Sequence, residues 1–136
     1  MALDLTPSSN SSTSITARRG DYHEIPLTIY SANGAVRNIT DDKIWFTVKS
    51  NPDAQADSAA EIRKGSSATG LTGISKVSST AGTALVVLDS TDTDPLAIRS
   101  YWYDVKIQST SDSKSYAVLA GPFILQRQTT RQPSGG

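Results

Sequence analysis

A two-residue alternation of apolar and polar side chains is the feature that most limits what this chain can fold into. In segment 101–107 every second residue is Tyr, Val or Ile, and the residues between them are Trp, Asp and Lys. Segment 43–49 repeats the pattern, with Ile44, Phe46 and Val48 on one face. Successive side chains of a strand point to opposite faces, so this period predicts strands that are buried on one side.

Segments of this kind recur along most of the chain. The expected strands are Tyr22–Tyr30, Lys43–Lys49, Glu61–Lys64, Ile74–Val77, Thr83–Leu88, Arg99–Gln108 and Ser115–Leu125. Residues that favour turns separate them, and there is no β-α-β alternation. The spacing predicts an all-β fold, an antiparallel β-sandwich of seven to eight strands, with a small closed barrel as the structural alternative.

Three proline positions predict irregularities in this pattern. Pro26 has no N–H to donate to a ladder, so its strand is expected at a sheet edge or to bulge there. Gly121-Pro122 is expected to interrupt the last strand. Segment 89–96 places Asp residues ahead of Pro95, which predicts one short helical turn with Pro95 at its first position.

The length and the two ends of the chain predict one domain with two arms. A chain of 136 residues fits one domain, and without cysteine it has no disulfide to brace it. Both ends are rich in Ser, Thr, Gln, Pro or Gly and cannot bury an apolar face. We expect a flexible N-terminal arm over 1–13, a β-sandwich domain over 14–125 and a flexible C-terminal tail over 126–136.

Charge and hydropathy argue against several classes of partner. Thirteen basic residues balance thirteen acidic ones, whereas a nucleic-acid binder normally carries a basic excess or stripe. No stretch approaches the roughly 20 apolar residues of a membrane span, and the N-terminus lacks the features of a secretory signal. We therefore expect a soluble protein with neither nucleic acid nor a membrane as its partner.

The titratable residues do not form a convincing catalytic or metal site. Asp89, Asp92 and Asp94 are spaced like part of a calcium loop, but the Gly and Glu that complete such a loop are missing, so turn and helix-cap roles are favoured. His23 is the one histidine, and no cysteine or nucleophile motif accompanies it. We therefore predict no catalytic, cofactor-binding or metal-binding residue and no cofactor, and we expect that the chain is not an enzyme.

Two tryptophans and two arginines are the candidate contact residues. Trp45 and Trp102 fall on the outward faces of their strands, where an indole can contact a protein partner or stack on a sugar. Equally, they could pack against each other across neighbouring strands or under a long loop. Arg127 and Arg131, in the tail, are candidates for ion pairs with carboxylates of a neighbouring protein.

The order of these features resembles a family of tailed-bacteriophage structural proteins. The likeness covers about Arg18 to Arg131 and rests on the segments Arg19–Asp21, Asn38–Asp41, Ile44–Lys49, Glu61–Gly65, Asp94–Ala97, Tyr101–Ile107 and Val118–Pro122. They are similar in strand pattern and turn chemistry to the immunoglobulin-like domain at the N-terminus of phage upper baseplate proteins. The resemblance implies an immunoglobulin-like sandwich without an active site.

The function that the resemblance implies is assembly of a virion. We expect a structural component of the tail, baseplate, neck or capsid that is made in the host cytoplasm. It would dock onto other virion proteins as a homo-oligomer or in multiple copies. The alternative hypothesis is a carbohydrate-binding module that recognises cell-surface glycans through its tryptophans. The two differ in whether the isolated domain binds a glycan.

Overall fold

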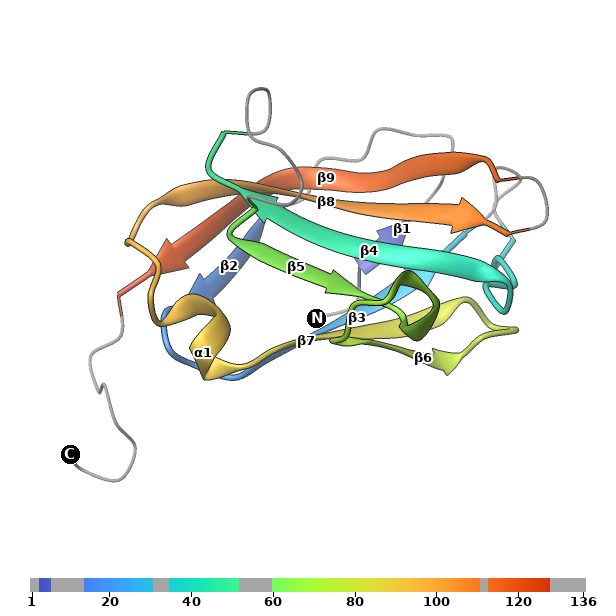
Figure 1. Ribbon diagram of the computed structural model, residues 1–136, viewed down its shortest axis with the longest axis horizontal. Helices are drawn as coiled ribbons and strands as arrows, with labels where there is room; N and C mark the ends of the chain where they lie inside the picture. The colour runs from blue at the N-terminus through green and yellow to red at the C-terminus, as the bar shows by residue number, and fades with distance from the viewer. Residues whose placement is uncertain (1–2, 6–13, 31–34, 52–59, 111–112, 128–136) are drawn as a thin grey trace.

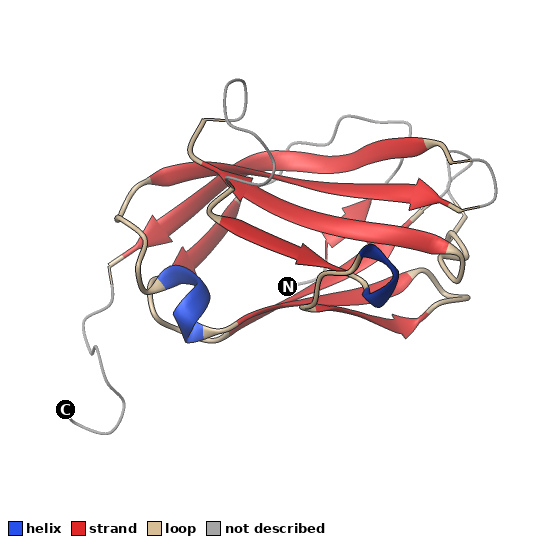
Figure 2. Cartoon of the chain, in the orientation of Figure 1, coloured by secondary structure: helices blue, strands red, loops and turns tan. Residues whose placement is uncertain are grey.

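Two packed β-sheets form the body of the protein. The structure, a computed structural model, describes residues 3–5, 14–30, 35–51, 60–110 and 113–127. Strands dominate this part of the chain, and the two sheets lie one above the other (Figures 1 and 2). The predicted all-β sandwich is confirmed, and the strands expected from the sequence correspond to β3 to β9, with β1 and β2 in addition.

The order of the strands defines the two layers. One sheet runs β1 (Leu3–Leu5), β3 (His23–Ile29), β7 (Thr83–Leu88) and β6 (Ile74–Ser78). The other runs β2 (Ile15–Arg18), β9 (Ser115–Gln126), β8 (Ser100–Ser109), β4 (Asp42–Lys49) and β5 (Ile62–Gly65). With β1 as strand A, this order corresponds to the A-B-E-D and G-F-C arrangement of immunoglobulin-type sandwiches.

The core lies between the layers and is built from the alternate residues of each strand. Along β4 buried and half-buried residues alternate without a break. At the centre the Phe46 ring stacks on the Tyr103 ring with centroids 5.7 Å apart, and it meets the edge of Phe123 at 6.4 Å. Phe46 and Phe123 are fully buried, so this cluster links three adjacent strands on the inner side of the five-stranded sheet.

A tyrosine corner holds the crossing into β8. The hydroxyl of Tyr101, at the start of β8, donates a hydrogen bond of 2.8 Å to the carbonyl of Ala97, four residues upstream. The same arrangement marks this corner in immunoglobulin-type sandwiches. The Arg99 guanidinium lies 5.3 Å from the centre of the Tyr101 ring, where a cation interacts favourably with the aromatic face.

The free edge of β3 corrects one sequence prediction and confirms another. Within the predicted arm 1–13, Leu3–Leu5 forms β1, which pairs in parallel with Leu27–Ile29 because the free edge of β3 offers unpaired backbone groups. The other residues of that arm lie outside the described part. Beside Pro26 the described chain places no strand on this edge, which confirms the edge position predicted for Pro26.

The last strand is continuous, so the interruption predicted at Gly121-Pro122 is wrong. β9 runs through both residues, with Gly121 opposite Tyr103 and Pro122 opposite Trp102. On its other side, β2 pairs with β9 only from Phe123 onward. Within the described residues no strand pairs with β9 beside Pro122 on this side, and an open edge tolerates a residue without an N–H.

The helical turn forms, but it precedes Pro95 and does not begin there. Helix α1 spans Ser90–Thr93, and an Asp92 carboxylate oxygen accepts the Asp89 N–H at 2.7 Å. Thr93 is fully buried, and its hydroxyl oxygen accepts the Gly20 N–H at 2.8 Å, which ties the turn to the β2–β3 connection. None of the described helices has the length and apolar character to cross a membrane.

Replacing the central phenylalanine tests the role of the ring cluster. We expect Phe46→Ala to lower the free energy of unfolding by about 3–5 kcal/mol, because it removes a fully buried ring and leaves a cavity. Urea unfolding followed by fluorescence measures this. Lys106→Ala, at an exposed position of β8, is the control and should stay within about 0.5 kcal/mol of the parent. Equal effects of the two changes would contradict a core centred on Phe46.

Removing the corner hydroxyl tests the tyrosine corner. We expect Tyr101→Phe to lower the free energy of unfolding by about 1 kcal/mol, the typical net contribution of one hydrogen bond. Tyr22→Phe is a matched control, because the Tyr22 hydroxyl donates to Glu24 on the exposed surface at 2.9 Å. The control should change stability by less than about 0.5 kcal/mol. The corner has no stabilising role if both variants unfold at the same urea concentration.

Candidate binding pocket on the five-stranded sheet

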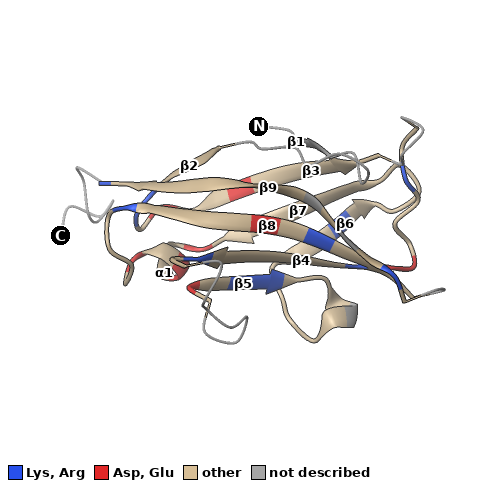
Figure 3. Cartoon of the chain, turned by 90° about the horizontal axis from the view of Figure 1, so that it is seen from above, with Lys and Arg blue, Asp and Glu red and all other residues tan. Residues whose placement is uncertain are grey.

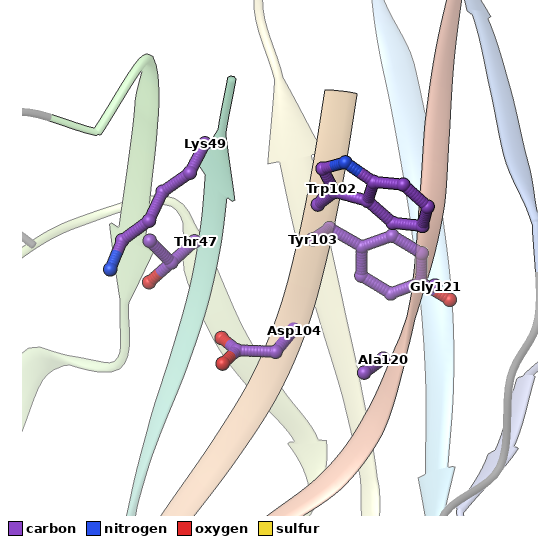
Figure 4. A pocket seen from close by; sticks show the side chains of 7 residues that line it. All are labelled: Thr47, Lys49, Trp102, Tyr103, Asp104, Ala120 and Gly121. Atoms are coloured by element: carbon purple, nitrogen blue, oxygen red, sulfur yellow. The ribbon is translucent and has the colours of Figure 1, made fainter. Parts of the chain in front are cut away.

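The outer face of the five-stranded sheet carries a pocket of about 260 Å³. We call it the outer pocket; it is lined by Thr47, Lys49, Trp102, Tyr103, Asp104, Ala120 and Gly121. These residues come from the three adjacent strands β4, β8 and β9 (Figure 4). The pocket therefore lies on the outer side of the strands whose inner side holds the ring cluster.

Strand register explains which side chains meet there. On β8, Trp102 and Asp104 point outward from the same face because they are two residues apart. Lys49 stands opposite Trp102, and Thr47 stands opposite Asp104. On the β9 side, Asp104 faces Ala120, whose small side chain leaves the space that the pocket occupies.

The side chains of Trp102 and Asp104 point to different sides of strand β8 (Figure 4). The indole of Trp102 lies toward β9, and the carboxylate of Asp104 lies toward β4 (Figure 4). Trp102 is 49% exposed, so about half of the indole is open to solvent. Large apolar side chains on a surface are common singly, but one beside a pocket with polar groups is typical of a recognition site.

The structure separates the two tryptophans that the sequence grouped together. Trp45 stands opposite Lys106, whereas Trp102 stands opposite Lys49, four positions further along β4. That offset is roughly 13 Å at about 3.3 Å per residue, so the two indoles are not cross-strand partners. Trp45 is half-buried and does not line the outer pocket. Of the two, only Trp102 belongs to the pocket.

Of the two arginine candidates, the described one, Arg127, does not line this pocket. Arg127 follows β9 directly and is exposed, and its carbonyl accepts a hydrogen bond of 3.2 Å from the Arg18 guanidinium. Arg131 lies outside the described residues. The structure therefore does not bring Arg127 together with Trp102, since Arg127 is not among the residues that line the outer pocket.

Buried below the outer pocket, Tyr103 has an altered acidity. Its side chain points into the core and is 3% exposed. Burial raises the pKa of Tyr103 from 10 to about 12, because the phenolate would lose its hydration. The hydroxyl is thus a neutral group at physiological pH, and the charges of the outer pocket come from Lys49 and Asp104.

Two of the three Asp residues that the sequence analysis named, Asp89 and Asp92, form the capping box of α1. Asp92 accepts the Asp89 N–H, as described above, and forms an ion pair of 2.8 Å with Lys64 of β5. The predicted capping role is therefore confirmed for Asp92. A buried carboxylate elsewhere, Asp42, is held by the Arg37 guanidinium at 2.7 Å and 3.2 Å. In the described ranges no three His, Cys, Asp or Glu side chains come close enough to hold a metal ion.

A second pocket lies where β2 and β3 meet at one side of the sandwich. It has a volume of about 210 Å³ and is lined by Ile15, Thr16, Ala17, His23, Glu24, Ile25 and Leu88. The ring of His23 is engaged there, since its Nε2 lies 3.2 Å from the Arg18 N–H nitrogen and 3.3 Å from the Arg18 carbonyl oxygen. His23 therefore takes part in local backbone contacts at the β2–β3 connection.

Charge is spread over the surface without a dominant sign. Acidic and basic residues are interspersed along the strands, and β8 carries both (Figure 3). The whole chain has a formal net charge of zero. The long-range field of such a surface is weak, so recognition depends on local contacts.

Comparison with known proteins shows a shared fold. No protein-family model and no characterised protein matches the sequence. Among solved structures, the N-terminal domain of ORF48 of phage TP901-1 is similar, with a TM-score of 0.59. The match covers 92% of this chain and 96% of that one at 11% identity. At this identity the likeness concerns the fold.

The outer pocket could not be predicted from the sequence, because its lining residues come from three strands. The outward position of Trp102 was readable from the alternation, but the partner residues come from two other strands. The run Ala120-Gly121 was a signal of open space, because small residues beside a large indole leave a hollow. Its meaning depends on β9 lying next to β8 in the observed register.

Alkaline unfolding tests the burial of Tyr103. The unfolded chain releases this proton near pH 10 and the folded chain near pH 12, so the folded state binds more protons between these values. The contribution of the Tyr103 hydroxyl to the free energy of unfolding is fully present below pH 10. It falls by about 1.4 kcal/mol per pH unit as the pH rises toward 12. We expect Tyr103→Phe to remove this part of the decline in urea unfolding experiments. Parallel curves for parent and variant between pH 10 and 12 would show that the hydroxyl is hydrated.

Proposed function

We propose that this chain is a structural component of a bacteriophage virion, present in several copies and acting as an assembly or adaptor module. The observation that carries the proposal is its likeness to the N-terminal domain of ORF48 of phage TP901-1, which extends over 92% of this chain and 96% of that one. The likeness thus involves a whole domain and not a single motif. Because one fold hosts many functions, the proposal also needs a contact surface.

The four-stranded sheet offers such a surface on its outer side. Leu85 and Val87 of β7 alternate with buried residues and therefore point away from the core. Leu85 stands opposite Pro26 of β3, and Val77, at the bulge of β6, is 68% exposed. We call Pro26, Val77, Leu85 and Val87 the apolar outer strip. Outward residues of a solvated sheet are normally polar, so this strip supports docking onto another virion protein.

The tail supports the same role through its charge. Arg127 is exposed at the end of β9, and Arg131 follows in the chain. A guanidinium binds a carboxylate through two parallel hydrogen bonds, which suits a contact with an acidic neighbour. In this proposal the chain works by assembly without catalysis, in the virion, after synthesis in the host cytoplasm.

Particle composition tests the proposal. Virions from the phage or prophage that carries this gene would be purified on a density gradient and analysed by quantitative mass spectrometry. We expect the chain in the particle fraction at several copies per virion, in a constant ratio to the other structural proteins. Its presence only in the soluble fraction of the lysate would refute a virion role.

A pair of variants tests the assigned surface in the same experiment. We expect Leu85→Glu to lower incorporation into particles at least tenfold, because a carboxylate within an apolar contact is costly to desolvate. Lys106→Glu, exposed on the opposite sheet, should be incorporated normally. The thermal unfolding of both purified variants would be compared first. Normal incorporation of a folded Leu85→Glu variant would mean that another face makes the contact.

A further inference from the structure

The outer pocket has one flat aromatic wall on its β9 side and hydrogen-bonding groups of three kinds on its β4 side (Figure 4). The half-exposed indole of Trp102 supplies the wall. The Asp104 carboxylate accepts hydrogen bonds, the Lys49 ammonium donates them, and the Thr47 hydroxyl does both. A carboxylate has about four acceptor positions, so Asp104 can bind a ligand while it keeps contacts within the protein.

We propose that the outer pocket binds one ring of a neutral saccharide. The C–H groups on the face of a sugar ring pack on an indole, whose ring faces carry partial negative charge. Sugar hydroxyls donate and accept hydrogen bonds at once, which matches the mixed set of Asp104, Lys49 and Thr47. The opposite charges of Lys49 and Asp104 balance within the pocket, which favours a neutral polar ligand over an anion or a cation.

The size of the pocket limits what it accepts. Its volume of about 260 Å³ lies below the range of roughly 300–1,000 Å³ for sites of drug-sized ligands. One sugar ring is the unit that suits such a space, and further units of a chain would lie along the open sheet face. Few contacts to one ring give weak binding, so affinity in the millimolar range is expected for a single unit.

This inference does not depend on a virion role. It concerns the outer face of the five-stranded sheet, whereas the apolar outer strip lies on the four-stranded sheet. It also differs from the carbohydrate-binding hypothesis of the sequence analysis, which used both tryptophans, because Trp45 does not line the outer pocket. Trp45 therefore serves as an internal control for Trp102.

The two indole N–H signals of the protein make the test direct. The chain has two tryptophans, so a nitrogen–proton correlation spectrum of the full-length protein shows two indole peaks, which Trp45→Phe assigns. The probes are the methyl glycosides of glucose, galactose and rhamnose, and N-acetylglucosamine, each titrated to tens of millimolar. We expect at least one probe to shift the Trp102 peak along a saturable curve while the Trp45 peak stays in place.

Two variants separate the hydrogen bonds of the pocket from general effects. We expect Asp104→Asn to weaken binding of that probe about tenfold, because it loses one charge-assisted hydrogen bond. Lys106→Gln, the next outward residue of β8 and outside the pocket, should bind as the parent does. Backbone amide peaks of each variant report whether it is folded.

The opposite results overturn the inference. If none of the four probes shifts the Trp102 peak, or if both indole peaks move equally without saturation, the outer pocket is not a saccharide site. If the probes fail while Trp102→Ala is excluded from purified particles, the pocket is a protein contact instead. Saccharide binding by a chain that is missing from virions would leave this inference standing and refute the virion role alone.

Discussion

The packing of Phe46 against Tyr103 and Phe123 is the interaction on which the rest of the structure depends. It places three strands of one sheet in a single register, because each ring must point inward. A slip of one residue would turn every inward side chain of a strand to the solvent. Trp102 and Asp104, which flank Tyr103 in β8, are therefore held outward by the same packing that buries the Tyr103 ring.

The two outer faces of the sandwich differ in chemistry, and this difference organises the functional proposals. The four-stranded sheet presents apolar residues on strand β7, where Leu85 and Val87 point outward. The five-stranded sheet presents a pocket in which an indole stands among polar and charged groups. An apolar strip suits a protein neighbour, and a mixed pocket suits a polar ring. Since a sandwich fold alone carries no function, these surfaces and not the fold direct the experiments.

Local patterns predicted most elements, and the errors came where an unseen neighbour changed the outcome. The strand 83–88 has the bounds expected from its residues, because its alternation depends on that segment alone. Gly121-Pro122 was expected to break β9, but the open edge beside Pro122 accommodates it. Leu3–Leu5 was expected to be part of a flexible arm, but the edge of β3 pairs with it. Both outcomes depend on strands distant in the sequence.

The sequence by itself determined the class of fold and the side of each strand that faces the core, because the two-residue period is a local property of the backbone. It also named Trp45 and Trp102 as outward residues. Only the tertiary structure decided that Trp102 borders a pocket with Asp104, Lys49 and Ala120 while Trp45 stands four positions away along β4. The physical reason is register: which residues face each other across strands depends on the packing of the whole core.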